Sequence, residues 1–182
     1  LSKFKRAEIV RNLTDRGLMG DREEFLDYVA ENGVNGTAFT SVGMFEGDSM
    51  EAEVIIPEIV LDVDSDDLQE AFETTHQIIQ TLEAEEVETE NITIAFSGKK
   101  GFHIRIPSGM FGNPIFKDRD VARRVLGRWA GDFLENDIDS SVLNPVHLIR
   151  AIGSRHTTGM YCTGFSVSEF KTHSLQGIID SS

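Results

Sequence analysis

Cysteine is almost absent from the chain, which has Cys162 alone among its 182 residues. A single cysteine cannot form an internal disulfide or supply the several thiolates of a structural zinc site. The sequence also lacks an apolar stretch approaching the roughly 20 residues that cross a bilayer, and it lacks the basic-then-apolar start of a signal peptide. We therefore expect a cytoplasmic protein that does not enter the membrane and has no zinc site in this chain.

Positive charge is scarce and unevenly placed. Seventeen Lys and Arg residues stand against 31 Asp and Glu residues, and the net charge of −14 argues against a polyanionic partner. No Lys or Arg lies between Glu23 and Gly98, whereas residues 99–155 contain ten basic and six acidic residues. An acidic half beside a locally basic half can still bind a polyanion on one face. Adaptation to high salt would also explain the acidity, and it is compatible with a local basic site.

The rest of the composition is that of a globular protein, with 40% apolar and 26% charged residues. The length suits one domain over residues 1–182, and the start at Leu1 indicates a fragment of a longer chain. Periodicity and turn residues predict a short helix after Asp21, helices at 68–82 and 118–134, and strands at 54–63, 92–96, 102–106, 148–151 and 160–170. The predicted fold class is therefore mixed α and β (α/β or α+β).

The first predicted strand ends in two acids, Asp62 and Asp64. Alternation along a strand puts both side chains on one face, about 6.5–7 Å apart. Carboxylates on one face repel each other, and their oxygens suit Mg²⁺ or Mn²⁺ held together with substrate phosphates. The residues that follow have a simpler interpretation, because Ser65, Asp66 and Asp67 can cap the next helix. A calcium loop is disfavoured, since its sixth position is Asp67 where the sharp turn requires glycine.

A basic turn bounded by glycines joins the predicted strands at 92–96 and 102–106. It reads Ser97-Gly98-Lys99-Lys100-Gly101, and His103 and Arg105 follow it on one face of the next strand. Glycines let a backbone approach an anion closely, while the lysines, the serine and the histidine supply charge and donors. This combination favours a triphosphate, although a glycine-lysine hairpin is also typical of an ordinary exposed turn.

A third group of polar residues follows the second long helix. Asp139 comes directly after an apolar residue and could complete a set of three carboxylates around a metal. Arg150 closes an apolar strand, and a Ser-x-His loop from Ser154 to His156 comes next. Arg150 and His156 could neutralise phosphate oxygens. Taken singly, Asp139 is equally typical of a surface acid, Arg150 of a salt-bridge partner and His156 of an ordinary loop histidine.

Together the three segments resemble the motifs of the archaeo-eukaryotic primase superfamily. These are an apolar strand ending in Asp-x-Asp, a Ser-Gly-basic-basic-Gly-aromatic-His hairpin, and an apolar-Asp followed by Leu-Ile-Arg and Ser-x-His-x-x-Gly. The resemblance spans about residues 23–165 and is closest to catalytic small subunits of primases and to primase-polymerases. The chain departs from those small subunits in lacking the cysteines of a zinc-binding insertion and in the short interval between His103 and Asp139. The resemblance implies a minimal catalytic core, with an antiparallel sheet of RNA-recognition-motif character flanked by helices.

The resemblance also implies a reaction, template-directed synthesis of RNA or DNA primers on single-stranded DNA. By this analogy Asp62, Asp64 and Asp139 are the catalytic residues and hold two Mg²⁺ or Mn²⁺ ions. The implied nucleotide-binding residues are Ser97, Gly98, Lys99, Lys100, His103, Arg150, Ser154 and His156. The implied partners are NTPs or dNTPs, the DNA template, and a primase large subunit or a replication helicase. The alternatives are an end-joining polymerase domain of the same superfamily and a non-catalytic RNA-recognition-like module that binds single strands.

The predicted helix at 118–134 is the candidate template-binding element. One face is expected to be apolar and packed, and its members are Val121, Ala122, Val125, Leu126, Trp129, Ala130 and Phe133. The other face carries Arg119, Arg123, Arg124 and Arg128, which would bind phosphates of a single strand. A solvated helix face with ion pairs to neighbouring acids is an equally good interpretation.

Overall fold

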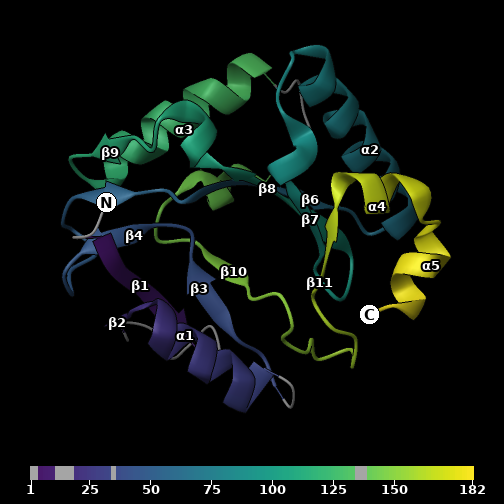
Figure 1. The fold of residues 1–182 in the computed structure, drawn as a ribbon, viewed down its shortest axis with the longest axis horizontal. Helices are drawn as coiled ribbons and strands as arrows, with labels where there is room; N and C mark the ends of the chain where they lie inside the picture. Colours follow the sequence, from purple (N-terminus) through teal and green to yellow (C-terminus); the bar gives the residue numbers. More distant parts are fainter. Residues whose placement is uncertain (1–3, 11–18, 34–35, 134–138) are drawn as a thin grey trace.

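The computed structural model describes residues 4–10, 19–33, 36–133 and 139–182, which form two antiparallel sheets and five α-helices (Figure 1). The smaller sheet has the order β11-β7-β8-β6, with β6 (Glu58–Asp64), β7 (Thr93–Phe96), β8 (Gly101–Pro107) and β11 (Thr163–Ser166). The larger sheet has the order β10-β3-β1-β4-β5-β9, with β2 paired to β1. Its strands are β1 (Phe4–Val10), β2 (Met19–Gly20), β3 (Phe39–Ser41), β4 (Met44–Glu46), β5 (Val54–Ile55), β9 (Ile115–Phe116) and β10 (Leu148–Arg150).

The smaller sheet has one apolar face and one polar face, because side chains alternate along each strand. The apolar face packs against α2 (Leu68–Ala84) and α4 (Val167–Thr172), which lie on that side of the sheet in Figure 1. Its buried side chains are Ile59, Leu61, Val63, Ile94, Phe96, Phe102, Ile104 and Ile106. The ring of Phe170 from α4 lies 5.4 Å from the ring of Phe102. The polar face, which carries Asp62 and His103, points toward β10 and β3 of the larger sheet.

One predicted strand is divided between the two sheets. Residues 54–55 form β5, whereas β6 begins at Glu58. Pro57 lies at the break, where its nitrogen has no hydrogen to donate to a strand ladder. Its carbonyl accepts a hydrogen bond from the Ser108 nitrogen at 2.9 Å. The prediction of one strand over 54–63 is therefore wrong, because the chain passes from one sheet to the other at Ile56 and Pro57.

The strand that pairs with β7 at the edge of the smaller sheet is β11. The predicted strand at 148–151 appears as β10, which pairs with β3 of the larger sheet. The predicted strand at 160–170 is wrong except over Thr163–Ser166, because α4 begins at Val167. Ser166 caps that helix, accepting from the Glu169 nitrogen while the Glu169 carboxylate accepts from the Ser166 nitrogen.

The three predicted helices are present. They are α1 (Arg22–Tyr28), α2 and α3 (Arg119–Phe133), with α4 and α5 (Leu175–Asp180) following β11. Asp21 begins α1 through a capping box with Glu24. The cap of α2 is Asp67 and not Ser65. The Ser65 hydroxyl instead accepts from the Asp67 nitrogen and donates to the Glu70 carboxylate. Among the described residues, no helix combines the length and apolar character needed to cross a membrane.

Candidate active site

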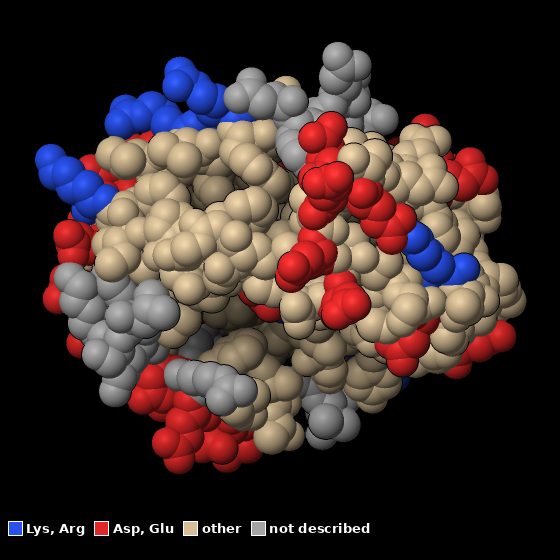
Figure 2. Space-filling view, turned by 45° about the horizontal axis from the view of Figure 1, so that its top comes forward, with Lys and Arg blue, Asp and Glu red and all other residues tan. Residues whose placement is uncertain are grey.

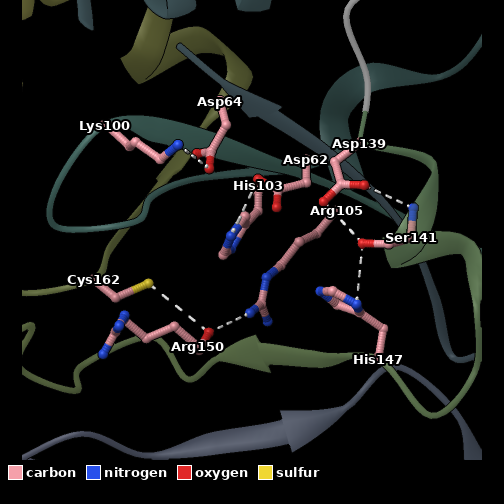
Figure 3. A network of polar contacts seen from close by, with 10 residues as sticks. All are labelled: Asp62, Asp64, Lys100, His103, Arg105, Asp139, Ser141, His147, Arg150 and Cys162. Atoms are coloured by element: carbon pink, nitrogen blue, oxygen red, sulfur yellow. Dashed lines mark hydrogen bonds and ion pairs between the residues drawn. The ribbon is translucent and has the colours of Figure 1, made fainter. Parts of the chain in front are cut away.

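The three predicted catalytic acids meet at one end of β6 (Figure 3). Asp62 and Asp64 project from the same face of this strand, as alternation requires. Asp139 precedes a 3₁₀ turn at Ser140–Leu143, and its backbone nitrogen donates to the Asp62 carbonyl at 3.0 Å. This hydrogen bond joins residue 139 to the outer edge of β6. Asp64 and Asp139 line one pocket of about 310 Å³ together with Thr74 of α2.

Asp62 is the acid whose ionisation the fold opposes most strongly. Burial, followed by the charges of Asp64 and Asp139, raises the pKa of Asp62 to about 7. Its Oδ1 atom is buried and has no hydrogen-bond donor among the described residues. The Nε2 atom of His103 lies 3.5 Å away, which is too far for a good hydrogen bond. The fold therefore places Asp62 among like charges, and the charge of Lys100 opposes their effect only in part.

His103 lies directly opposite Asp62 on β8 and is buried. Burial, and then the charges of Arg105, Arg150 and His147, lower the pKa of His103 to about 3, so the imidazole is uncharged near neutral pH. The 3.5 Å approach to Asp62 is thus a contact with a neutral ring and not an ion pair. The Nδ1 atom of His103 is buried and accepts or donates no hydrogen bond within the described part of the chain.

Asp64 is held by the basic hairpin. The Nζ atom of Lys100 lies 3.2 Å from a carboxylate oxygen of Asp64, and this pairing raises the pKa of Lys100. Gly101 is directly opposite Asp64 in the β6–β8 ladder. A Cβ at position 101 would overlap the Asp64 carboxylate and the Val63 carbonyl. Glycine is therefore required here so that β8 can approach the acid closely.

Asp139 is anchored by residues that the sequence patterns did not single out. One carboxylate oxygen accepts from the Ser141 nitrogen at 2.8 Å, and the other accepts from the Ser141 hydroxyl at 2.8 Å. The Ser141 hydroxyl is also 3.3 Å from Nδ1 of His147. These bonds to Ser141 lower the pKa of Asp139. The Asp-x-Ser spacing, typical of a local turn, could have indicated Ser141, whereas no local pattern indicated His147.

Arg105 is a further residue that the site predictions left out. From β8 it reaches across the space between the sheets, and its Nη2 donates to the Arg150 carbonyl at 2.9 Å. Its Nη1 lies 3.5 Å from the Glu58 carboxylate, while its Nε is buried without an acceptor among the described residues. The alternation of β8 places Arg105 beside His103, and this signal was available in the sequence. Arg105 thus ties the polar face of the smaller sheet to β10.

The predicted cationic residues are brought together by contact between the hairpin and the loop after β10. Gly98 has φ +86°, and a Cβ there would lie 2.9 Å from Cβ of His156. The Thr158 hydroxyl donates to the Gly98 carbonyl at 2.7 Å. Burial, then the charges of Arg150 and Lys99, lower the pKa of His156. Lys99, Arg150 and His156 therefore share one electrostatic neighbourhood next to the acids.

Two predicted nucleotide-binding serines differ in their surroundings. Ser154 is fully buried, and its hydroxyl lies within hydrogen-bond distance of the Ala151 and Ala38 carbonyls, at 2.8 Å and 3.3 Å. This hydroxyl is directed into the protein, so the prediction that Ser154 contacts nucleotide is not supported by its position. Ser97 is half-buried at the hairpin, and its nitrogen donates to the Gly101 carbonyl at 3.0 Å.

The predicted template-binding helix, α3, differs from expectation on both faces. Arg119 forms an ion pair with Glu51 at 2.9 Å, so it is already occupied within the molecule. The other three predicted arginines are exposed: Arg123, Arg124 and Arg128. Val125, expected on the packed face, is 50% exposed, whereas Ala122, Leu126 and Ala130 are buried. The packed stripe is narrower than predicted and follows Ala122, Leu126 and Ala130 at intervals of four. The side chain of Phe133 lies outside the described residues.

Comparison with known proteins gives one line of support for the fold. No protein-family model matches the chain, and no curated protein matches it in sequence. Among solved structures, the AEP domain of the primase-polymerase (PrimPol) of cyanophage S-2L matches with a TM-score of 0.54 and 18% identity, over 90% of this chain and 80% of that chain. The fold is primase-like. The predicted mixed α and β class, with an antiparallel sheet flanked by helices, is confirmed, and the structure adds a second antiparallel sheet.

The sequence predicts that the acids at the end of β6 hold Mg²⁺ or Mn²⁺, and their chemistry fits such an ion. Carboxylate oxygens are the ligands that Mg²⁺ and Mn²⁺ prefer, and the buried Oδ1 of Asp62 has no other partner within the described residues. In those residues, however, no group of three or more His, Cys, Asp or Glu side chains is arranged to hold an ion. The reason is visible in Figure 3: Asp64 is directed to Lys100 and Asp139 to Ser141.

Proposed function

We propose that the chain is a nucleotidyltransferase that adds nucleotides to a strand copied from single-stranded DNA. The observation that carries this proposal is the meeting of Asp62, Asp64 and Asp139 beside a cationic hairpin and loop. A carboxyl group whose pKa is raised by burial and by like charges is costly to the fold, and such groups concentrate at functional sites. The primase-like fold supports the same class of reaction.

The three acids would hold two Mg²⁺ or Mn²⁺ ions, which supply an activated hydroxyl and neutralise the charge of the leaving phosphates. Asp62 lies between the other two acids (Figure 3), and a cation bound there would favour its ionised form over the protonated form that its raised pKa otherwise supports. His103 packs against Asp62 as a neutral ring, so it supports the carboxylate without cancelling its charge. Ser141 positions Asp139 through two hydrogen bonds. The protein thus supplies a fixed acidic centre whose geometry is set by β6 and its neighbours.

The triphosphate of the incoming nucleotide would lie against the hairpin and the loop after β10. Lys99 and Arg150 supply positive charge, His156 supplies a ring nitrogen, and Ser97 and the backbone at Gly98 supply donors. Lys100 lies between this region and the acids, since it already pairs with Asp64. We assign Ser154 a positioning role, because its buried hydroxyl fastens the loop to Ala38. The template is not assigned to α3, where Arg119 is held by Glu51.

A non-catalytic single-strand-binding module is less well supported. Such modules present aromatic side chains on the open face of the sheet, where bases stack. Here the corresponding face carries Asp62, Asp64, His103 and Arg105. Carboxylates on that face would repel a nucleic-acid backbone unless cations intervene. The end-joining alternative uses the same chemistry, and a large subunit or a helicase would act outside these residues.

The reaction is tested by incubating the protein with an unprimed single-stranded DNA template, labelled NTPs or dNTPs, and Mg²⁺ or Mn²⁺. Products with a 5′-triphosphate would indicate a primase, and extension of supplied primers alone would indicate a polymerase or an end-joining enzyme. Asp64→Asn should abolish either product. Asp66→Asn is the matched control, because Asp66 is exposed just beyond the site. Absence of any product with either ion, together with strand binding that survives Asp64→Asn, would contradict the proposal.

A further inference from the structure

The outward side of α3 carries a continuous stripe of apolar and basic residues. Positions 121, 124, 125, 128 and 129 are spaced by three and four, which aligns them along one side of a helix. They line an open groove of about 740 Å³, and its lining residues are Val121, Arg124, Val125, Arg128 and Trp129. We call this surface the α3 groove. None of its residues belongs to the proposed catalytic or nucleotide-binding set, so the two assignments can be tested separately.

Apolar side chains are unusually exposed at the α3 groove. Val125 is 50% exposed near the middle of the helix, where a valine would ordinarily be packed. Trp129 is only partly buried, and its ring makes an edge contact at 5.7 Å with Phe111, which is 43% exposed. Ile115 of β9, the strand next to α3 in Figure 1, is 52% exposed. A concentration of apolar surface at one place is typical of an interaction site.

The charge of the groove is opposite to that of the molecule as a whole. Arg124 and Arg128 are one helical turn apart along the groove, while the chain carries a net charge of −14. In Figure 2 most of the visible basic side chains lie along the upper left edge, over the side where Figure 1 places α3, whereas acidic side chains predominate on the α2 side. A ligand that is both apolar and acidic would complement the α3 groove. The acidic surface elsewhere on the molecule would repel such a ligand.

We propose that the α3 groove docks an acidic amphipathic helix of a partner protein. A helix lying along the groove would insert apolar side chains at i, i+3, i+4 and i+7 over Val121, Val125 and Trp129. Acidic residues on the flanks of that helix would pair with Arg124 and Arg128. At 15 residues, α3 is about 22 Å long, which accommodates roughly four turns of a partner.

A protein helix fits the groove better than a single strand of nucleic acid does. The centre of the groove is aliphatic, and its one large aromatic ring is already packed edge-on against Phe111. Bases stack on the open faces of aromatic rings or guanidinium groups. Two arginines in one row along a helix would contact few phosphates, and the salt dependence of binding follows the number of contacts. Single-stranded DNA is therefore the alternative that the experiment must be able to detect.

The test uses a fluorescein-labelled synthetic peptide of about 18 residues, with leucines on one helical stripe and glutamates on both flanks. Fluorescence anisotropy should show micromolar binding, and a scrambled peptide of the same composition should bind at least about tenfold more weakly. Arg124→Glu with Arg128→Glu should weaken binding about tenfold. Val125→Lys should also weaken it about tenfold, although it adds a favourable charge, because it fills the apolar centre.

Arg123→Glu is the matched control, since Arg123 is exposed on the same helix but does not line the groove. It should change peptide binding by less than about twofold. Equal weakening by Arg123→Glu and by the groove variants would overturn the proposal, as would equal binding of the scrambled peptide. Tight binding of a labelled oligo-dT that is lost in the groove variants, without peptide binding, would assign the surface to the template. Sedimentation showing a dimer that Val125→Lys dissociates would assign it to a second copy of the chain.

Discussion

The two faces of the smaller sheet come from the same strands, yet they differ in almost every physical property. On the face under α2, Leu61 and Phe102 are fully buried among apolar neighbours. On the opposite face, Asp62 and His103 are enclosed with polar atoms that have no partner among the described residues. The first face stabilises the fold through burial, and the second destabilises it through unbalanced charge and unsatisfied donors and acceptors. A fold keeps such a face when the chemistry depends on it, and the following predictions test this division.

Asp62→Asn is expected to have the largest effect on activity. The substitution keeps the size of the side chain but removes the charge that the proposed ions require, so nucleotide addition should fall by at least about a thousandfold. The measurement is primer extension with Mn²⁺, alongside circular dichroism to show that the fold is intact. Primer extension by the variant at the wild-type rate would contradict the assignment of the chemistry to the polar face of the smaller sheet.

Asp62 should also make stability depend on pH. Its pKa is raised to about 7 in the folded protein, above the value of about 4 in an unfolded chain. The folded state therefore binds more protons between those values, and stability falls as pH rises through that window. In metal-free buffer, Asp62→Asn should gain up to about 4 kcal/mol over wild type at pH 8 and almost nothing at pH 4. Chemical denaturation at the two pH values measures this difference, and a gain that is equal at both would contradict it.

Leu61→Ala tests the opposite face at the adjacent position of β6. Leu61 is fully buried, so its truncation should lower the free energy of unfolding by about 3 kcal/mol through lost burial and a residual cavity. Turnover per folded molecule should stay near the wild-type value, because the polar face is unchanged. Urea denaturation and active-site titration separate the two quantities. A large loss of turnover with unchanged stability would show that the two faces are not functionally distinct.

Ser141→Ala should have the smallest effect of these substitutions. It should change the pKa of Asp139 and leave the fold unchanged. The variant removes the hydroxyl that donates to Asp139 but keeps the backbone donor, so the pKa of Asp139 should rise part of the way toward its usual value. Carbon-detected NMR titration of the Asp139 carboxyl group measures the shift, with Ser140→Ala as the neighbouring control. An unchanged pKa would mean that the backbone bond alone sets the position of Asp139.

Sequence patterns were sufficient for the parts of the site that lie within one element. Alternation along β6 and β8 correctly placed Asp62 beside Asp64 and His103 beside Arg105. The glycines and lysines of the hairpin, and the apolar period of α2, were equally visible. Failures came where a local pattern was ambiguous, as at Pro57, or where β-like residues follow a helix cap, as after Ser166. In both cases strand propensity was overruled by local hydrogen-bonding chemistry.

The sequence by itself determined which residues are ionisable, which strands are two-faced and where the hairpin turns, because these depend on the residue itself and on neighbours one to four positions away. Only the tertiary structure decided that Asp139 joins the edge of β6 through the Asp62 carbonyl, and that Ser141 and His147 come with it. It also decided that Val125 remains exposed beside Arg124 and Arg128. The physical reason is that burial and pairing between distant segments set the pKa of Asp62 and the exposure of α3, and no local periodicity encodes such contacts.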